Sequence, residues 1–159
     1  SPVDIIENIC ACRKVGANYL LNVGPTATGQ FPAYETATLE RIGEWVRLYG
    51  DLLYEGKPAP IKGQGADFAL TCNGKVYLFI HQLAVAGHGN VTVGFGGTGP
   101  RAFSGMSQTV KAARWLDNGE ELAFAHDEKS GLFALDATGY PYGVNLVVRV
   151  AEVEVRSWI

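Results

Sequence analysis

The chain has 159 residues, of which 47% are hydrophobic and 18% charged, so it can bury a core without disulfides or a metal. Its net charge of −3 offers no basic surface to a phosphate backbone, which argues against nucleic acid as a partner. The longest apolar runs, residues 76–80 and 146–150, are far shorter than the roughly 20 residues of a membrane-spanning helix, so we expect no membrane partner.

The first predicted element is a helix. Apolar side chains recur at helical spacing from Val3 to Cys10. Arg13 and Lys14 lie where the last turn would be, and Gly16 is a typical stop. We interpret this segment as the end of a helix that begins upstream.

A buried strand is predicted next, from Asn18 to Val23. This short apolar run ends at Gly24-Pro25 and is typical of a parallel strand that is covered on both faces. Parallel pairing needs further strands, and none follows in the same pattern. We therefore expect the rest of that sheet to lie upstream or in another chain.

A second helix is predicted from Pro32 to about Gly50. Proline suits the first helical turn, and apolar residues continue at spacings of three and four from Leu39 to Tyr49. Helix, strand and helix together form one turn of an α/β fold.

The pattern changes after residue 55, where Gly56-Lys57-Pro58-Ala59-Pro60 indicates a break. From Ala66 onward the chain alternates in short strands, and Asn73-Gly74 predicts a type I′ hairpin between two of them. Further strands are predicted over residues 90–95, 110–116, 121–126, 131–137 and 144–155. About seven short strands at this spacing indicate an antiparallel β-sandwich.

Three stretches of the first third then carry a family resemblance: Gly-Ala-Asn-Tyr-Leu-Leu-Asn-Val-Gly-Pro-Thr-Ala-Thr-Gly at residues 16–29, Ile-Gly-Glu-Trp at 42–45 and Tyr-Gly-Asp-Leu-Leu-Tyr at 49–54. They resemble the closing segment of the catalytic barrel in family 29 glycoside hydrolases, the α-L-fucosidases. The remaining residues are similar in kind to the β-sandwich that follows this barrel. At the loop before the second helix the family usually has Asp, whereas this chain has Thr28 before Gly29, so the role of that carboxylate is lost or passes to a hydroxyl.

The resemblance implies an α+β fold class in two domains. Residues 1–55 would be a helix-strand-helix remnant of a (β/α)8-type barrel, and residues 56–159 the C-terminal antiparallel β-sandwich. A retaining glycosidase of this kind needs two carboxyl groups about 5–5.5 Å apart, carried at the ends of barrel strands. The loop of residues 22–30 has no Asp or Glu, and Glu35, Glu40 and Glu44 are expected on the exposed face of the following helix.

No position matches the nucleophile or the acid/base of the family, so we assign no catalytic, cofactor-binding or metal-binding residue. The histidines His81, His88 and His126 are dispersed, and surface or satisfied sandwich positions are favoured over a metal or triad role. The cysteines Cys10, Cys12 and Cys72 are favoured as buried free thiols.

Two other patterns allow alternatives. Tyr140, Tyr142 and Trp158 could form a sugar-stacking platform, although packing is favoured, and Trp45 and Trp115 are expected in the core or between domains. The glycine-rich residues 94–99 lack the ending of a phosphate loop and are expected to turn, while residues 90–92 fit a glycosylation acceptor.

Two functions follow as expectations. The chain is either a C-terminal fragment of an α-L-fucosidase-like retaining hydrolase, which cleaves terminal α-L-fucosides when joined to its upstream barrel, or a non-catalytic β-sandwich accessory or carbohydrate-binding module. The expected partners are a fucosylated glycan through the missing barrel, and a second copy or a complementing chain through residues 18–23. Alone, the chain is expected to be inactive.

Overall fold

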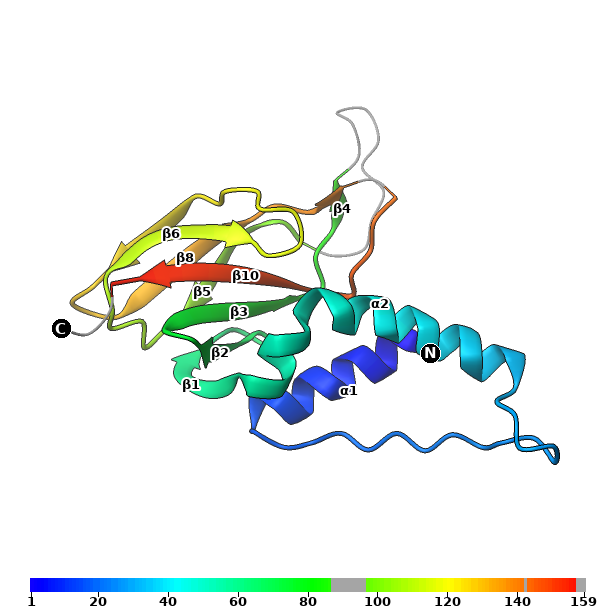
Figure 1. Ribbon diagram of the computed structural model, residues 1–159. Helices are drawn as coiled ribbons and strands as arrows, with labels where there is room; N and C mark the ends of the chain where they lie inside the picture. Colours follow the sequence, from blue (N-terminus) through cyan, green and yellow to red (C-terminus); the bar gives the residue numbers. More distant parts are fainter. Residues whose placement is uncertain (87–96, 142, 157–159) are drawn as a thin grey trace.

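The computed structural model describes residues 1–86, 97–141 and 143–156, which form three layers (Figure 1). A pair of helices covers the outer face of a five-stranded sheet, and a three-stranded sheet packs on the inner face. The helices are α1 (Pro2–Lys14) and α2 (Ala33–Glu55). The strands are β1 (Lys57–Lys62), β2 (Phe68–Cys72), β3 (Lys75–His81), β4 (Val85–Ala86), β5 (Gly99–Phe103), β6 (Val110–Trp115), β7 (Phe124–Asp127), β8 (Leu132–Ala137), β9 (Tyr140–Pro141) and β10 (Val148–Val155).

The α+β fold class is therefore confirmed. The five-stranded sheet has the antiparallel order β1-β2-β3-β10-β6, and the three-stranded sheet has the antiparallel order β5-β8-β7. A short parallel pair, β4 with β9, lies at one end. No helix in the described ranges is long and apolar enough to cross a membrane.

The first helix forms where the sequence predicts one. The Ser1 hydroxyl accepts the backbone N–H of Asp4 at 3.4 Å, and the Asp4 carboxylate accepts from the Ser1 amino group at 2.9 Å. At the other end Gly16 takes a φ of 74°.

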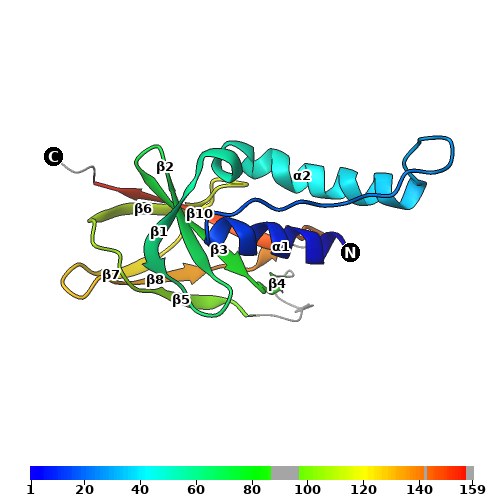
Figure 2. The ribbon, with the colours of Figure 1, turned by 90° about the horizontal axis from the view of Figure 1, so that it is seen from below.

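The strand expected over residues 18–23 is wrong for this structure, because the segment is extended but belongs to no sheet. Tyr19, Leu21 and Val23 are half-buried, whereas the residues between them are exposed and Leu20 is 84% exposed. Figures 1 and 2 show this connection running along the helix pair, on the side away from the sheets. A parallel strand cannot form its ladder without a neighbour, and the described residues supply none beside it.

Helix α2 is longer than the sequence pattern indicates. It continues through Gly50 to Glu55, because Leu52 and Leu53 bury against the sheet and offset the cost of a glycine within the helix. Gly56 ends it by donating its N–H to the carbonyl of Leu52 at 2.9 Å. A Cβ at Gly56 would collide with that carbonyl, so the helix end requires glycine.

The hairpin between β2 and β3 forms as predicted. Asn73 and Gly74 have φ values of 48° and 76°, as a type I′ turn requires, and Cys72 pairs with Lys75.

Most of the later strands are confirmed, with shifted ends. Strands β6, β7, β8 and β10 match four predicted ones, but β7 begins at Phe124 and β10 at Val148. Strands β1 and β5 were not predicted, and the predicted strand at 90–95 lies outside the described residues. The helical part ends at the break predicted over residues 56–60, since α2 ends at Glu55. Residues 57–62 of this stretch then form the edge strand β1, because edge strands tolerate proline.

Two hydrophobic cores result. One lies between the two sheets and includes Trp115, Phe103 and Phe133. The other lies between the helices and the outer face of the five-stranded sheet and includes Trp45. Both faces of the five-stranded sheet are thus covered, which explains why nearly every residue of β10 is buried.

Candidate functional site

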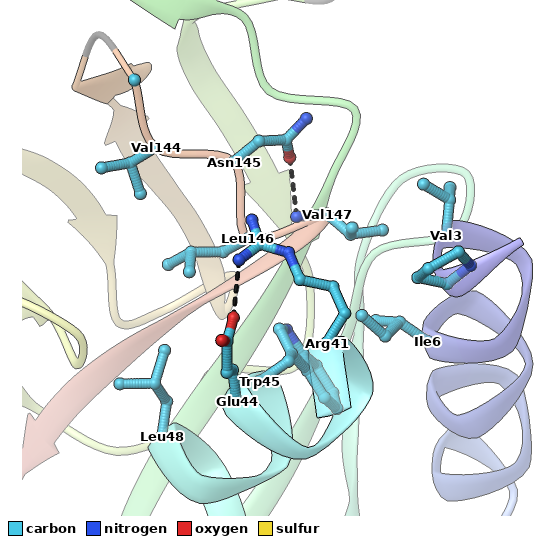
Figure 3. A pocket seen from close by; sticks show the side chains of 12 residues that line it. Val3, Ile6, Arg41, Glu44, Trp45, Leu48, Val144, Asn145, Leu146 and Val147 are labelled. Carbon is cyan, nitrogen blue, oxygen red and sulfur yellow. Dashed lines mark hydrogen bonds and ion pairs between the residues drawn. The ribbon is translucent and has the colours of Figure 1, made fainter. Parts of the chain in front are cut away.

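A cleft of about 530 Å³ opens between the helix layer and the sandwich (Figure 3). Its volume falls within the roughly 300–1,000 Å³ of small-molecule sites. Its walls are mainly apolar side chains from the start of α1, the middle of α2 and the segment that leads into β10, namely Pro2, Val3, Ile6, Trp45, Leu48, Val144, Leu146 and Val147.

One ion pair lies at the rim of this cleft. Arg41 donates to Glu44 one helical turn away at 2.6 Å, and both side chains are more than half exposed. Such a pair contributes little to stability, roughly 0–1 kcal/mol. Arg41 and Glu44 are therefore free to exchange partners with a ligand at little cost.

The wall formed by residues 143–147 holds an unusual backbone conformation. Val147 has a φ of 65°, in the left-handed region that β-branched residues avoid. Asn145 holds the turn, since its side-chain oxygen accepts the backbone N–H of Val147 at 2.8 Å (Figure 3). This turn is why β10 begins at Val148 and not at residue 144 as the sequence predicts.

The strain at Val147 gives a direct test. Replacing Val147 with Gly relieves about 1–2 kcal/mol of left-handed strain and loses part of a half-buried side chain, so the two effects nearly cancel. We expect Val147→Gly to unfold at a urea midpoint no lower than that of Val147→Ala. The matched variant Val150→Gly lies in the middle of β10 and should be clearly destabilised. A Val147→Gly midpoint well below that of Val147→Ala would contradict the assigned strain.

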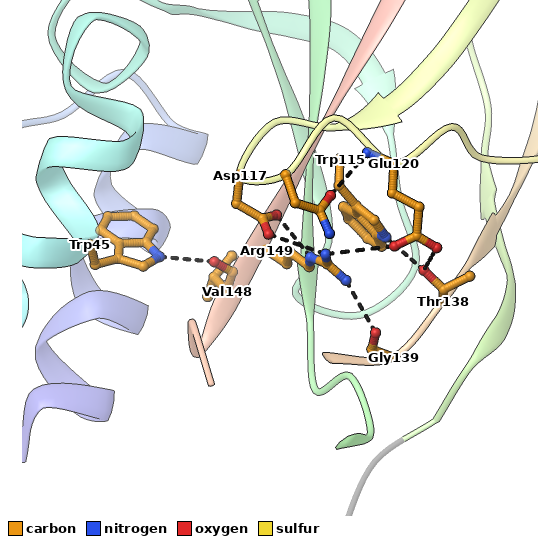
Figure 4. A network of polar contacts seen from close by, with 9 residues as sticks. Trp45, Trp115, Asp117, Glu120, Thr138, Gly139, Val148 and Arg149 are labelled. Carbon is orange, nitrogen blue, oxygen red and sulfur yellow. Dashed lines mark hydrogen bonds and ion pairs between the residues drawn. The ribbon is translucent and has the colours of Figure 1, made fainter. Parts of the chain in front are cut away.

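Behind the cleft a polar network ties the helix layer to the sandwich (Figure 4). Trp45 donates its indole N–H to the carbonyl of Val148 at 2.8 Å. The next residue, Arg149, is fully buried. Its guanidinium donates two hydrogen bonds to the Asp117 carboxylate, from Nε to Oδ1 at 2.8 Å and from an Nη to Oδ2 at 3.1 Å. Its guanidinium also lies over the ring of Trp115, 4.3 Å from the ring centre.

The same network fixes the end of the sandwich. Arg149 donates to the carbonyl of Gly139 at 3.1 Å. Trp115 donates to the hydroxyl of Thr138 at 2.7 Å, and Thr138 donates in turn to Glu120 at 3.1 Å. These contacts are structural, because each charged or polar group already has its partner.

The buried carboxylates of the described residues are all held by cations. Asp67 pairs with Arg101, Asp117 with Arg149, and Glu152 with Arg114 and Lys75. Burial alone would raise the pKa of Glu152, but its hydrogen bonds and charge attraction to Lys75 and Arg114 hold that pKa below its usual value. A group that stays ionised in this way cannot serve as the acid of a glycosidase pair.

The three glutamates of α2 are not equivalent. Glu40 and Glu44 are exposed, as expected. Glu35, expected on the exposed face, is half-buried instead, and one of its carboxylate oxygens is enclosed with no partner among the described residues. It lies in the first turn of α2, beside the connection from α1.

The loop at Thr28 is closed by hydroxyls. Thr26 and Thr28 share a hydrogen bond at 2.9 Å between their hydroxyl oxygens, and the Thr26 hydroxyl accepts the N–H of Gln30 at 3.1 Å. Gly29 turns the loop with a φ of 80°. In this chain hydroxyl groups thus fix the loop where the resemblance led us to look for a carboxylate.

The remaining candidates lie apart from one another. His126 bonds the carbonyl of Met106 at 2.9 Å, and His81 lies beside Asp67, while His88 falls outside the described residues. Cys10 is buried, and burial raises the pKa of its thiol. Cys12 and Cys72 are only half-buried, so the expectation of buried thiols holds for one of the three.

Two of the three aromatic residues considered for a sugar platform, Tyr142 and Trp158, are outside the described residues, and the third, Tyr140, is buried in the core. Trp45 and Trp115 are both buried, as predicted. Within the described ranges no group of three or more His, Cys, Asp or Glu side chains is arranged to hold a metal ion.

Sequence reasoning missed Arg149, Asp117 and Val147. A signal for Arg149 exists, because a single arginine inside the apolar run of residues 146–151 must find a buried counter-ion. Its partner Asp117 is 32 residues away, and no pattern points to it. The conformation of Val147 has no sequence signal at all.

Comparison with known proteins places the first third of the chain. A family model described as alpha-L-fucosidase matches residues 1–51. The tissue alpha-L-fucosidase of Mus musculus is 33% identical over 61 residues, which are 38% of this chain and 14% of that protein. The alpha-L-fucosidase of Dictyostelium discoideum is 31% identical over 84 residues, or 51% of this chain and 17% of that one.

The first third of the chain is thus similar in sequence to the α-L-fucosidase family. Solved structures of the family extend the likeness to the whole fold. Alpha-L-fucosidase isoenzyme 1 from Paenibacillus thiaminolyticus covers 99% of this chain with a TM-score of 0.75 and 23% identity, and the Thermotoga maritima alpha-fucosidase covers 97% with a TM-score of 0.70 and 18% identity. The match takes up 35% and 34% of those two chains, so this chain spans about a third of their length.

Proposed function

We propose that this chain supplies the closing segment of an α-L-fucosidase barrel together with the sandwich that supports it, and that it hydrolyses terminal α-L-fucosides only when joined to the remainder of the barrel. In this proposal residues 1–55 belong to the barrel and residues 56–159 form the C-terminal domain. No catalytic residue is assigned to the chain itself.

The observation that carries the proposal is the extended segment of residues 18–23. Its side chains alternate between half-buried and exposed, as in a strand whose one face already has its covering helices. Its backbone has no ladder partner among the described residues. A barrel strand whose two neighbouring strands are absent would have this form.

The distribution of carboxyl groups also supports the proposal that the catalytic residues come from the remainder of the barrel. The two carboxyl groups of a retaining glycosidase are carried at the ends of different barrel strands. This chain contributes one such strand, and its following loop has no Asp or Glu. The carboxylates that the sandwich buries are committed to arginine and lysine.

Activity tests the proposal. The isolated chain is expected to release no nitrophenol from an aryl α-L-fucoside. A chimera in which this chain replaces the matching third of the Paenibacillus thiaminolyticus enzyme is expected to release it. Turnover that follows the isolated chain through purification would refute the proposal, as would a folded, soluble chimera without activity.

The same segment predicts self-association. Its free backbone groups and the exposed Leu20 favour pairing with a second copy or with a complementing chain. We expect sedimentation to show a concentration-dependent dimer or larger species that Leu20→Asp weakens. Leu132→Asp, at an exposed position of β8 on the opposite layer, is the matched control and should change nothing. A chain that stays monomeric, with residues 18–23 protected from amide exchange, would contradict this.

A non-catalytic accessory or carbohydrate-binding module is the second candidate. One observation favours it: both helices share a continuous buried core with the sandwich, so the chain has a packed interior of its own. Inactivity of the isolated chain fits either candidate, and the chimera separates them.

A further inference from the structure

A second cleft lies at one end of the sandwich, where β2 begins, β3 ends and β5 passes by. It has a volume of about 540 Å³, which is within the range of small-molecule sites. It is more polar than the cleft beside Val147, and its lining includes the side chains of Asp67 and His81.

The base of this cleft is unusually polar for buried protein. Asp67 is 3% exposed and the side chain of His81 is 8% exposed. One carboxylate oxygen of Asp67 accepts the backbone N–H of His81 at 2.8 Å and lies 3.4 Å from the ring Nδ1 of the same residue. That Nδ1 is enclosed and makes no hydrogen bond with any described residue.

The Asp67 carboxylate thus lies beside Nδ1 of the imidazole without a hydrogen bond to it. A carboxylate beside Nδ1 favours the tautomer with its proton on Nδ1, which leaves Nε2 as an acceptor. With Nδ1 enclosed, Nε2 is the ring nitrogen left to meet a molecule in the cleft.

Arg101 sets the charge of the site. Its guanidinium donates to the other Asp67 oxygen at 3.1 Å and to the carbonyl of His81 at 2.9 Å. It also donates to the carbonyls of Gln82 at 3.2 Å and Gly97 at 3.3 Å. Because both terminal nitrogens are committed and the carboxylate is neutralised, the described residues of the cleft offer neither a free cation to an anion nor a free carboxylate to a cation.

The rim adds groups that both donate and accept. The side chains of Gln64 and Gln82 are exposed and line the cleft. Gln82 has a φ of 52°, so the chain accepts a strained backbone at this position. Carboxamides and an imidazole suit the hydroxyl groups of a neutral ligand.

We propose that this cleft binds a neutral, polyhydroxylated ring of monosaccharide size, with Nε2 of His81 accepting a ligand hydroxyl and the carboxamides of Gln64 and Gln82 bonding its neighbours. The site needs no catalytic barrel. It gives the carbohydrate-binding alternative a location and is independent of fucoside hydrolysis.

The test is an NMR titration of the isotope-labelled 159-residue chain. L-fucose and D-galactose are added as neutral probes, and glucuronate and glucosamine as charged counterparts of similar size. We expect saturable shifts of the His81 ring and of the amides of Gln64, Gly65 and Gln82 with a neutral sugar, and at least several-fold weaker binding of the charged ones.

Variants locate the site. Gln82→Gly keeps the left-handed backbone and removes the carboxamide, and Gln64→Ala removes the other; each should weaken binding several-fold. His81→Phe keeps a ring beside Phe68 and should abolish it. Because Gln64 and Gln82 are exposed, their variants remain informative even where His81→Phe unfolds. Arg41→Ala, in the other cleft, should leave binding unchanged. The absence of saturable shifts with both neutral sugars, or shifts that map to the cleft at Val147, would overturn the proposal.

Discussion

Replacing Arg149 with alanine is expected to lower the free energy of unfolding by about 3–5 kcal/mol, because it leaves the Asp117 carboxylate enclosed without its cation. The substitution also removes the guanidinium from the face of Trp115 and the bond to the carbonyl of Gly139. Since whole domains are stable by only about 5–15 kcal/mol, this loss would remove a large part of the stability of the chain.

Two further variants separate charge from shape. Arg149→Lys keeps the charge but loses the bidentate hydrogen bond to Asp117 and the stacking on Trp115, so we expect an intermediate loss of unfolding free energy. The double variant Arg149→Met with Asp117→Leu removes both charges together and should recover most of the stability of the single variants. Urea unfolding followed by circular dichroism measures all of these. A double variant that is as unstable as Arg149→Ala would show that the pair itself is not the cause.

Replacing Trp45 with alanine is the second large effect that we expect, with a loss of about 3–5 kcal/mol. Trp45 fills the core between α2 and the five-stranded sheet and meets Tyr49 edge to face at 5.2 Å. Trp45→Phe keeps a ring but leaves the carbonyl of Val148 without its donor, which costs about 1–3 kcal/mol. Glu44→Ala, on the exposed side of the same helix, should change stability by less than about 1 kcal/mol.

Hydrogen exchange of Trp45→Ala also tests the proposed boundary after residue 55. If the helices belong to a separate barrel, the amides of α1 and α2 should lose protection while those of β8, in the other core, keep it. Equal loss of protection in both layers would mean that residues 1–55 and 56–159 are one cooperative unit, and the proposed division would fail.

The sequence predicts best those features that short spacings determine. Asn73-Gly74 specifies its hairpin because both residues accept positive φ, and the helical spacing before Gly16 specifies α1. The resemblance to the fucosidase family was also visible in the sequence, because the motif at residues 16–29 is one contiguous stretch.

The features that long-range contacts determine were not predictable. Gly50 is a stop signal locally, yet Leu52 and Leu53 gain more from the sheet than the glycine costs. The strand expected at 18–23 fails because its neighbours, not its own residues, would make it a strand. Asp67 and Arg101 are 34 residues apart, so nothing in either local pattern indicates that the two share a site.

Strand β1 has a further consequence for how the sandwich meets other molecules. Pro58 and Pro60 lie two residues apart, so their missing N–H groups fall on the same side of the strand, which in an edge strand is the solvent side. At the opposite edge, Ala113 and Trp115 of β6 already bond to the backbone of Leu122 and Glu120. Both edges of the large sheet thus discourage growth by added strands. Residues 18–23 carry neither proline nor charge, so this extended segment lacks the features that keep an added strand off the large sheet.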